Sequence, residues 1–361
     1  MNIRIDKNLL LTPLSKLVNI TERRSIMPIL SNILLSFSKE TLTIYSTDLE
    51  ISAIGRVDYP SPVEKRVVVH GKKFMEILKE MDQGDVDLDF DDSTLTIRQK
   101  QSEFVLSLHD PEEFPEVKEI GEGEEFSMAG ADFLEILDKV SFAVSSDETR
   151  YVLTGMYMAG AADKVSVVGT DGFRMALYQK DIPGLNAFKG VIVPKRSVVE
   201  VGRVVSETDT IKFTIGAKHI QFSTPSITVI SRLIEGSFPD YQNVIPKTNS
   251  NVAKIDKAKF MKGLRKVSTI ISKSEPIKVT YNDRTMEIET ESEIGRGKEL
   301  VEITYEGEAL TMNFNIRFVM DVVSHIDGES IFVKAPSTYG AVLFVGENED
   351  NYKNIVMPIR V

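Results

Sequence analysis

Residues 10–17 read LLTPLSKL, residues 133–140 read FLEILDKV and residues 260–267 read FMKGLRKV. In each stretch apolar residues stand at positions i, i+1, i+4 and i+7, which predicts one face of an amphipathic helix. A lysine precedes the last apolar residue in all three: Lys16, Lys139 and Lys266. Each stretch also follows a short alternating segment, at residues 3–5, 126–128 and 253–255, that predicts a strand. The chain is therefore predicted to contain three copies of one structural unit.

A second motif recurs about sixty residues into each copy. Segments 67–69, 191–193 and 312–314 predict strands that lead into helices. In those helices a basic residue is followed four positions later by an acidic one, as in Lys72 with Glu76, Arg196 with Glu200 and Arg317 with Asp321. Residues i and i+4 share a helix face, so each base and acid can pair there, although a base before an acid is the weaker orientation. Smaller repeats agree: Thr47-Asp48, Thr170-Asp171 and Thr290-Glu291, and Phe114-Pro115 with Phe238-Pro239.

Two polar stretches, 119–125 and 246–251, separate the copies and are typical of linkers. We place domain boundaries there, which gives domains at 1–121, 122–247 and 248–361. Most of the remaining sequence consists of short alternating runs with turn residues between them, such as 41–45 and 86–97. The expected fold class is α+β, with two helices packed on antiparallel sheet in each of three similar domains. A length of 361 residues suits two or three domains.

The composition excludes several classes of protein. Apolar residues make up 42% and charged residues 27%, which is typical of a folded protein. The chain has no cysteine, so disulfides, thiolate nucleophiles and cysteine metal sites are ruled out. It has no run long enough to span a membrane and no apolar leader after Met1. We expect a cytoplasmic protein that does not bind membranes.

The net charge of -11 predicts repulsion from nucleic acid unless the charges are segregated. The six expected helical windows are 7–20, 70–81, 131–144, 194–205, 256–271 and 315–326. They hold 15 of the 43 basic residues and 8 of the 54 acidic ones, so the helices carry +7 and the remainder -18. The charge pattern allows two interpretations: that lysine and arginine cover solvated helix faces, or that equivalent helices gather on one basic rim that holds a polyanion without reading its sequence.

No catalytic or metal-binding constellation stands out. The four histidines, His70, His109, His219 and His325, lack ligand spacing. Residues 295–298 lack the full phosphate-loop pattern and predict a charged hairpin loop. The aspartates between 87 and 92 alternate with apolar residues and predict the solvent face of a strand that leads into a turn, and Asp171 is interpreted as a structural turn residue. We expect no metal, no cofactor and no enzymatic activity.

Several segments together resemble the bacterial DNA polymerase III beta subunit, the replicative sliding clamp family. They are residues 24–32, 150–155, 170–176, 191–194, 236–241 and 356–361, in the family's order from the first strand to the last residue. The resemblance implies a homodimer of three-domain chains that forms a ring around duplex DNA. It also implies a tether without catalytic activity, opened by a clamp loader, for the DNA polymerase III alpha subunit and for other polymerases and repair proteins.

In this family partners insert short peptides into an apolar pocket between the second and third domains. Carried onto matching positions, the resemblance implies a pocket with two arginines at its edges and mostly apolar walls, although core packing is the alternative for Leu153, Met175 and Val244. The set is Arg150, Leu153, Thr170, Gly172, Phe173, Met175, Pro239, Val244, Met357, Pro358, Ile359 and Arg360. No individual residue is assigned within 336–345.

The resemblance also implies contacts with DNA and with a second chain. Arg24 and Tyr151 match positions that contact the duplex, and the helix repeat adds Lys72, Arg196 and Arg317. The dimer interface is expected to join Ile270 and Ile271 to the segment from Phe104 to Leu108 of another chain. The leading hypothesis is thus a DNA sliding clamp. The alternatives are a triplicated α+β enzyme for an acidic small substrate and a peptide-binding scaffold that does not act on DNA.

Overall fold

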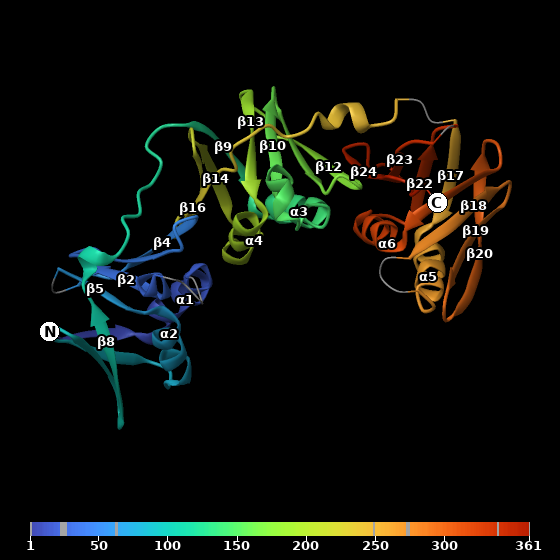
Figure 1. The fold of residues 1–361 in the computed structure, drawn as a ribbon. Coiled ribbons are helices and arrows are strands. Elements are labelled where there is room, and N and C mark those ends of the chain that lie inside the picture. The colour runs from blue at the N-terminus through green and yellow to red at the C-terminus, as the bar shows by residue number, and fades with distance from the viewer. Residues whose placement is uncertain are drawn as a thin grey trace. The chain divides into compact units, whose positions relative to one another are not determined.

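A computed structural model describes residues 2–21, 27–61, 64–247, 250–271, 275–337 and 339–360 (Figure 1). The chain divides into two compact units, Met1–Leu134 with Arg196–Leu233, and Glu135–Lys195 with Ile234–Val361. Each unit contains one twelve-stranded sheet, and all of its strand pairs are antiparallel. The expected α+β class with antiparallel sheet is confirmed.

The strands of the first sheet, in spatial order, come from the first copy and part of the second. They are β1 (Asn2–Asp6), β6 (Asp85–Phe90), β7 (Thr94–Gln99), β8 (Ser102–His109), β5 (Lys65–His70), β2 (Asn32–Phe37), β3 (Thr41–Thr47), β4 (Ile51–Asp58), β16 (Ile227–Arg232), β15 (His219–Ser223), β14 (Thr210–Ile215) and β9 (Glu124–Ala129).

The second sheet takes the other strands of the second copy and all those of the third. They are β13 (Phe188–Pro194), β10 (Gly155–Ala161), β11 (Lys164–Thr170), β12 (Arg174–Asp181), β24 (Tyr352–Val356), β23 (Val342–Gly346), β22 (Ser330–Ala335), β17 (Asn251–Asp256), β20 (Gly295–Glu306), β19 (Thr285–Ser292), β18 (Pro276–Asn282) and β21 (Leu310–Asn315). The strands of the middle copy are thus shared between two sheets, because β4 pairs with β16 and β12 pairs with β24.

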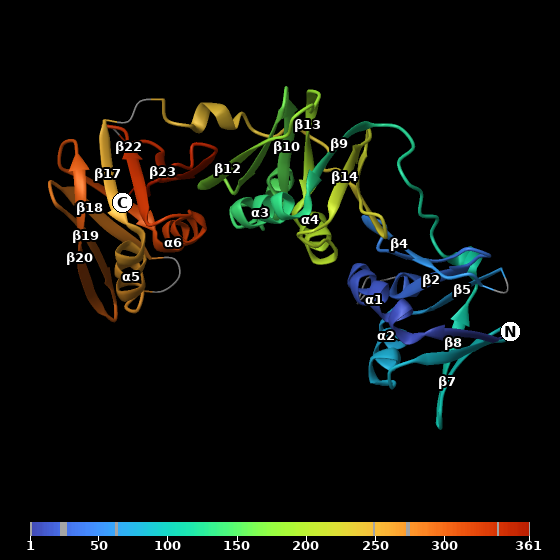
Figure 2. The ribbon, with the colours of Figure 1, turned by 180° about the vertical axis from the view of Figure 1, so that it is seen from behind.

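Two helices belong to each copy, as expected. They are α1 (Lys7–Leu17) and α2 (Gly71–Glu80), α3 (Gly130–Ser141) and α4 (Lys195–Val204), and α5 (Lys257–Val267) and α6 (Ile316–His325). In the second unit α5 and α6 lie side by side, as both ribbon views show (Figures 1 and 2). Short 3-10 turns add η1 (Val18–Ile20), η2 (Pro28–Ser31), η3 (Pro111–Glu113), η4 (Glu148–Leu153) and η5 (Tyr241–Val244).

The predicted apolar helix faces are buried. In α1 the core side chains include Leu10, Leu14 and Leu17, and in α5 the equivalent Phe260, Leu264 and Val267. The starts of α1, α5 and α6 are capped by polar side chains. These side chains accept hydrogen bonds from backbone N–H groups that have no partner within the helix.

The face of α3 differs by one position from the expectation. Phe133, Ile136 and Val140 are buried, whereas Leu137 is only half-buried. In a 3.6-residue helix both i+3 and i+4 lie near the same face, and packing selects between them.

The aspartate-rich hairpin forms as predicted. Val86, Leu88 and Phe90 are buried, and Asp87 and Asp89 alternate with them along β6. Asp91 then closes the turn by accepting the backbone N–H groups of Ser93 and Thr94. The segment 295–298 belongs to a hairpin, but it forms the start of strand β20, paired with β19, and the turn lies at 293–294. The prediction that these residues form the hairpin loop is wrong, because they pair with β19 along their whole length.

Candidate functional site

The turn between β11 and β12 is the centre of the predicted peptide site. The Asp171 carboxylate accepts the N–H groups of Phe173 and Arg174, each at 2.9 Å, and the Thr170 hydroxyl donates to the Arg174 carbonyl at 2.6 Å. Asp171 is therefore a structural turn residue, as predicted. Gly172 has a φ of 86°, a left-handed conformation that favours glycine. The turn presents Phe173 to solvent with 55% of its surface exposed.

Arg150 lies beside this turn on η4. Its guanidinium stands over the Phe173 ring at 5.5 Å from the centroid, and Asp147 holds its Nε at 3.1 Å. A Cβ at position 172 would lie 2.7 Å from the Arg150 Nη1 atom. Glycine is needed here both for the turn and for the close approach of the arginine.

The C-terminal segment crosses the same turn. The Met357 N–H donates to the Phe173 carbonyl at 2.8 Å, and the Ile359 N–H donates to the Asn313 carbonyl at 2.7 Å. Pro358 is buried, and its carbonyl accepts the Tyr339 hydroxyl. These bonds fix the segment in one place against β12 and β21.

Aromatic and aliphatic side chains line the floor beneath these residues. The buried cluster consists of Val168, Met175, Leu177, Leu343 and Ile355, with Tyr157, Phe238, Tyr241, Ile245, Ala341 and Val345 packed against it. The pairing of β12 with β24 brings residues 174–178 beside 352–356 and so assembles this floor. The five central side chains are buried, and the partly buried residues packed on them offer the apolar surface that suits peptide side chains.

The predicted pocket residues differ in how exposed they are. Leu153 and Met175 are buried at 7% and 3% exposure and belong to the core, as their alternative interpretation has it. Val244 is 41% exposed, and Gly172, Pro239 and Arg360 are also exposed. Thr170, Met357 and Ile359 are half-buried. Pro239 also borders a cleft of about 420 Å³ with Tyr157 and Tyr241.

Sequence reasoning missed several side chains that the fold brings to this site. Tyr339 lies in the unassigned segment, is 47% exposed and carries the Arg360 guanidinium at 4.6 Å from its ring centroid. Phe318 of α6 stacks on Phe173 with ring centroids 6.5 Å apart. The recurrence of Phe-Pro at 114 and 238 was the one signal that pointed to Phe238.

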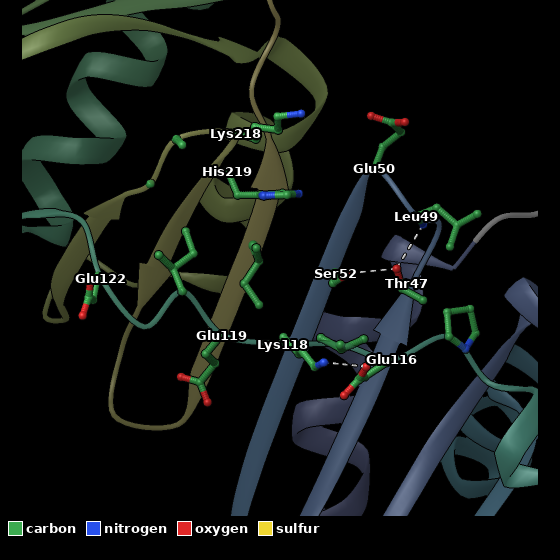
Figure 3. A pocket seen from close by; sticks show the side chains of 16 residues that line it. Thr47, Leu49, Glu50, Ser52, Glu116, Lys118, Glu119, Glu122, Lys218 and His219 are labelled. Atoms are coloured by element: carbon green, nitrogen blue, oxygen red, sulfur yellow. Dashed lines mark hydrogen bonds and ion pairs between the residues drawn. The ribbon is translucent and has the colours of Figure 1, made fainter.

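The first unit contains the same turn between β3 and β4. The Thr47 hydroxyl donates to the Ile51 carbonyl, Asp48 accepts the N–H groups of Glu50 and Ile51, and Leu49 has a φ of 75°. A cleft of about 620 Å³ lies beside it (Figure 3). Leu49 and Glu50 stand where the second copy has Gly172 and Phe173. This cleft is lined by Glu50, Glu116, Glu119, Glu122, Lys118 and Lys218 among others. It therefore lacks the aromatic surface of the second turn.

The helical lysine and arginines predicted to contact DNA differ in their pairing. Lys72 lies 3.8 Å from Glu76, so the expected i,i+4 pair forms there. Arg196 instead reaches Asp48 at 2.6 Å. In the third copy Asp321 pairs with Arg174 rather than with Arg317, which is exposed. The i,i+4 pairing that the spacing allows therefore forms in the first copy and not in the other two, where an acid or base from another element is the partner instead.

Tyr151 is 56% exposed, and Arg24 lies outside the described residues.

Part of the helical positive charge is not free to meet a polyanion. Lys7 and Lys139 are buried at 4% and 3% exposure. Lys7 donates to the Met81 carbonyl at 2.5 Å, and Lys139 bonds Asp327 and Glu349 at 2.7 and 3.0 Å. The charge partition read from the sequence thus overstates the accessible cations.

A buried carboxyl accompanies Arg196 on α4. Glu200 is 6% exposed and accepts from Arg203. Burial raises the pKa of the Glu200 carboxyl above its ordinary value, against the lowering effect of the two nearby arginines. Across the described ranges no group of three or more His, Asp or Glu side chains could hold a metal ion.

The expected dimer residues lie on two separate surfaces. Phe104 on β8 is 41% exposed and its neighbour Val105 is 57% exposed, while Leu108 is half-buried. Ile270 and Ile271 are half-buried just after α5. The Ile270 carbonyl accepts the Ser292 hydroxyl at 2.8 Å, which fixes the segment against the β19–β20 hairpin.

No helix within the described ranges is both long and apolar enough to cross a membrane.

Profiles of the DNA polymerase III beta subunit match the chain in order: the N-terminal domain at 1–118, the central domain at 127–240 and the C-terminal domain at 242–360. The beta sliding clamp of Caulobacter vibrioides is 31% identical over the full length of both chains.

Solved structures agree with the sequence matches. The DNA polymerase III beta subunit of Pseudomonas aeruginosa superposes with a TM-score of 0.96 at 27% identity, over the whole of both chains. The beta subunit of Thermotoga maritima superposes with a TM-score of 0.93 at 26% identity, over 100% of this chain and 99% of the other.

Proposed function

This chain belongs to the DNA polymerase III beta subunit family, and from that premise we propose that two copies close into a ring around duplex DNA. As a member of the family it is a beta sliding clamp, a non-catalytic processivity factor whose partners are DNA and polymerase. The full-length match in three successive domains is the observation that carries this function. The hypothesis of a triplicated enzyme is set aside on the same ground. We further propose domain boundaries near residues 121 and 248 and a cytoplasmic location.

The proposed DNA contacts are sequence-independent. Lys72 and Arg317 are exposed on equivalent helices. The exposed Tyr151 adds a ring and a hydroxyl to the proposed DNA-contact residues. We assign Arg24 and Arg196 to the same set. Side chains of this kind bind phosphates and leave the bases unread, so a ring can move along any sequence.

Encirclement is tested by DNA topology. The clamp, loaded by its clamp loader, is expected to stay on circular DNA through gel filtration and to leave the same DNA after one double-strand cut. A topological link has no escape route without an end, whereas a simple electrostatic complex is indifferent to ends. Equal retention on the circular and the cut DNA would reject the ring.

The strand pairing inside the chain supports the dimer. At two places the fourth strand of one copy pairs with the last strand of the next, as β4 with β16 and β12 with β24. By the same rule residues 295–302 of β20, which pair with β19, would pair on their other side with β8 of a second chain, while residues 303–306 pair with β17. Among the described strands, β8 pairs with β7 along its length but with β5 only at Leu108 and His109. An open edge with exposed Phe104 and Val105 favours strand addition.

The dimer interface proposed here joins this β8 edge to Ile270, Ile271 and the β19–β20 hairpin. Exposed Ile294 and Leu300 add apolar surface to that hairpin. Burial of apolar area is needed, because exposed ion pairs stabilise an interface by only about 0–1 kcal/mol each. Sedimentation is expected to give twice the mass of one chain, and a Val105→Lys substitution is expected to shift the protein toward one chain. A wild-type protein that stays monomeric at all concentrations would reject the dimer.

The proposed peptide site is the surface around Phe173. Its apolar floor, the exposed Val244 and Phe173 and the two edge arginines suit a short peptide that is anchored by large side chains. The half-buried Met357 provides an adaptable contact. We assign to it the alpha subunit of the polymerase, the clamp loader and the other polymerases and repair proteins of the family.

Deletion of residues 357–361 tests the assignment. A synthetic peptide copied from the C-terminus of the polymerase alpha subunit is expected to bind the wild type and not the deletion variant, while the dimer mass stays unchanged. Because Met357 bonds the Phe173 carbonyl, Phe173→Ala serves as a second variant that leaves the segment in place. Unaltered peptide affinity in both variants would reject the site.

A further inference from the structure

Two equivalent lysines each reach the end of a helix that lies far away in the sequence. Lys16, near the end of α1, donates its Nζ to the Val204 carbonyl at 2.7 Å. Lys139, at the same position of α3, donates its Nζ to the His325 carbonyl at 2.7 Å. Each bond lies within one compact unit of the chain. The first helix of one copy thus binds the second helix of the next copy at both places.

The two acceptors are equivalent as well. Helices α2, α4 and α6 each contain ten residues, and their last residues are Glu80, Val204 and His325. Within a copy, the carbonyl of the residue just after the second helix also accepts a lysine. Lys7 donates to the Met81 carbonyl, and Lys257 donates to the Ile326 carbonyl. Carbonyls in the last turn lack partners within the helix, and the helix dipole makes that end negative.

Among the residues that the structure describes, the third lysine and the third helix end have no such partner in the same chain. Lys266 occupies the same position of α5, with 52% of its side chain exposed, and lies 2.6 Å from Glu299. Glu80 ends α2 beside a cleft of about 340 Å³. Phe104, a residue of the proposed dimer interface, borders that cleft together with Met81 and Asp82. Lys266 and the end of α2 therefore belong to the surfaces already assigned to the two sides of the dimer.

We propose that Lys266 donates a hydrogen bond to the Glu80 carbonyl of a second copy of this chain. This inference rests on the dimer proposed above and names one contact of its interface. On assembly Lys266 leaves its pair with the half-buried Glu299 and enters a cleft where the negative helix end and the Glu80 carboxylate attract its charge. Asp82 also lines this cleft but is already paired with Lys100 at 2.6 Å. The interface between chains then repeats the contact that joins successive copies within the chain.

Lys266→Met tests the contact because it keeps the length and removes the donor. Loss of a hydrogen bond from a charged group is expected to weaken the dimer about ten-fold, measured as the dissociation constant by sedimentation equilibrium. Lys262→Met is the matched control: Lys262 is exposed on the same helix one turn earlier, and no equivalent of it reaches a helix end. The control is expected to stay within about two-fold of the wild type.

A second measurement locates the contact. With p-benzoylphenylalanine in place of Lys266, irradiation of the dimer is expected to cross-link residues 80–82 of the other chain, identified by mass spectrometry in mixed isotope-labelled dimers. Cross-links confined to the same chain, or equal dissociation constants for the Lys266→Met and Lys262→Met variants, would overturn the contact while leaving the dimer intact. A wild type that never dimerises would overturn the dimer and this contact together.

Discussion

At the scale of single residues, one glycine controls the proposed peptide site. Gly172 takes a φ of 86° and leaves room for the Arg150 guanidinium, whose Nη1 would lie 2.7 Å from an added Cβ. Gly172→Ala is expected to cost about 1–2 kcal/mol of stability and to displace Arg150 from the Phe173 ring. Binding of the alpha-subunit peptide, measured by titration calorimetry, is expected to weaken. Leu49→Ala changes the equivalent turn of the first unit and is expected to leave peptide binding unaltered. Peptide affinity that survives Gly172→Ala would contradict the role of Arg150.

A second residue-scale prediction concerns Asp91. The Thr94 hydroxyl and the backbone N–H groups of Ser93 and Thr94 lower the pKa of Asp91 to about 2. A folded pKa below the unfolded one contributes stability that is present above about pH 4 and is lost as the pH falls through 2. Thr94→Val is expected to raise this pKa, followed by carbon NMR of the carboxyl group. Thr96→Val is the control, and an unchanged pKa in Thr94→Val would refute the hydroxyl's role.

At the scale of elements, Lys139 ties α3 to the segments after α6 and β23. Its ammonium bonds the His325 carbonyl, Asp327 and Glu349 and lies 4.7 Å from the centre of the Tyr352 ring. Lys139→Met leaves the poorly exposed Glu349 carboxylate without its cation and is expected to cost about 3–5 kcal/mol. Lys16→Met removes a single bond to a carbonyl and is expected to cost about 1 kcal/mol. Hydrogen exchange measures the difference, on the α3 amides for Lys139→Met and on the α1 amides for Lys16→Met, each relative to the wild type. An equal loss of protection in the two variants would contradict it.

At the scale of the whole molecule, DNA binding depends on accessible cations rather than on the charge of every helix. Arg196 is held 2.6 Å from Asp48, while Arg317 is exposed. Arg317→Gln is therefore expected to reduce the steepness of the plot of log association constant against log salt concentration by about 0.9, and Arg196→Gln by less. The slope is measured by fluorescence anisotropy over a salt series. Equal slopes for both variants would show that the Asp48 pair does not withhold Arg196.

The repeat of helices and strands could be predicted because its signals lie within a few residues of one another. Leu10, Leu14 and Leu17 face the core as their spacing indicates, and the alternation in β6 separates buried from solvated residues. Ion pairs were predicted less well. Arg196 and Asp48, or Arg174 and Asp321, come from different copies, and no local pattern reports that they meet.

The amino-acid sequence alone established the triplicated α+β plan, the helix faces and, by resemblance, the clamp family. Folding in three dimensions was needed to show that Lys7 and Lys139 are buried, that Tyr339 and Phe318 join the surface around Phe173, and that the middle copy divides its strands between two sheets. The reason is physical: periodicity records which side of an element is apolar, whereas strand pairing between residues almost two hundred positions apart selects which apolar sides meet.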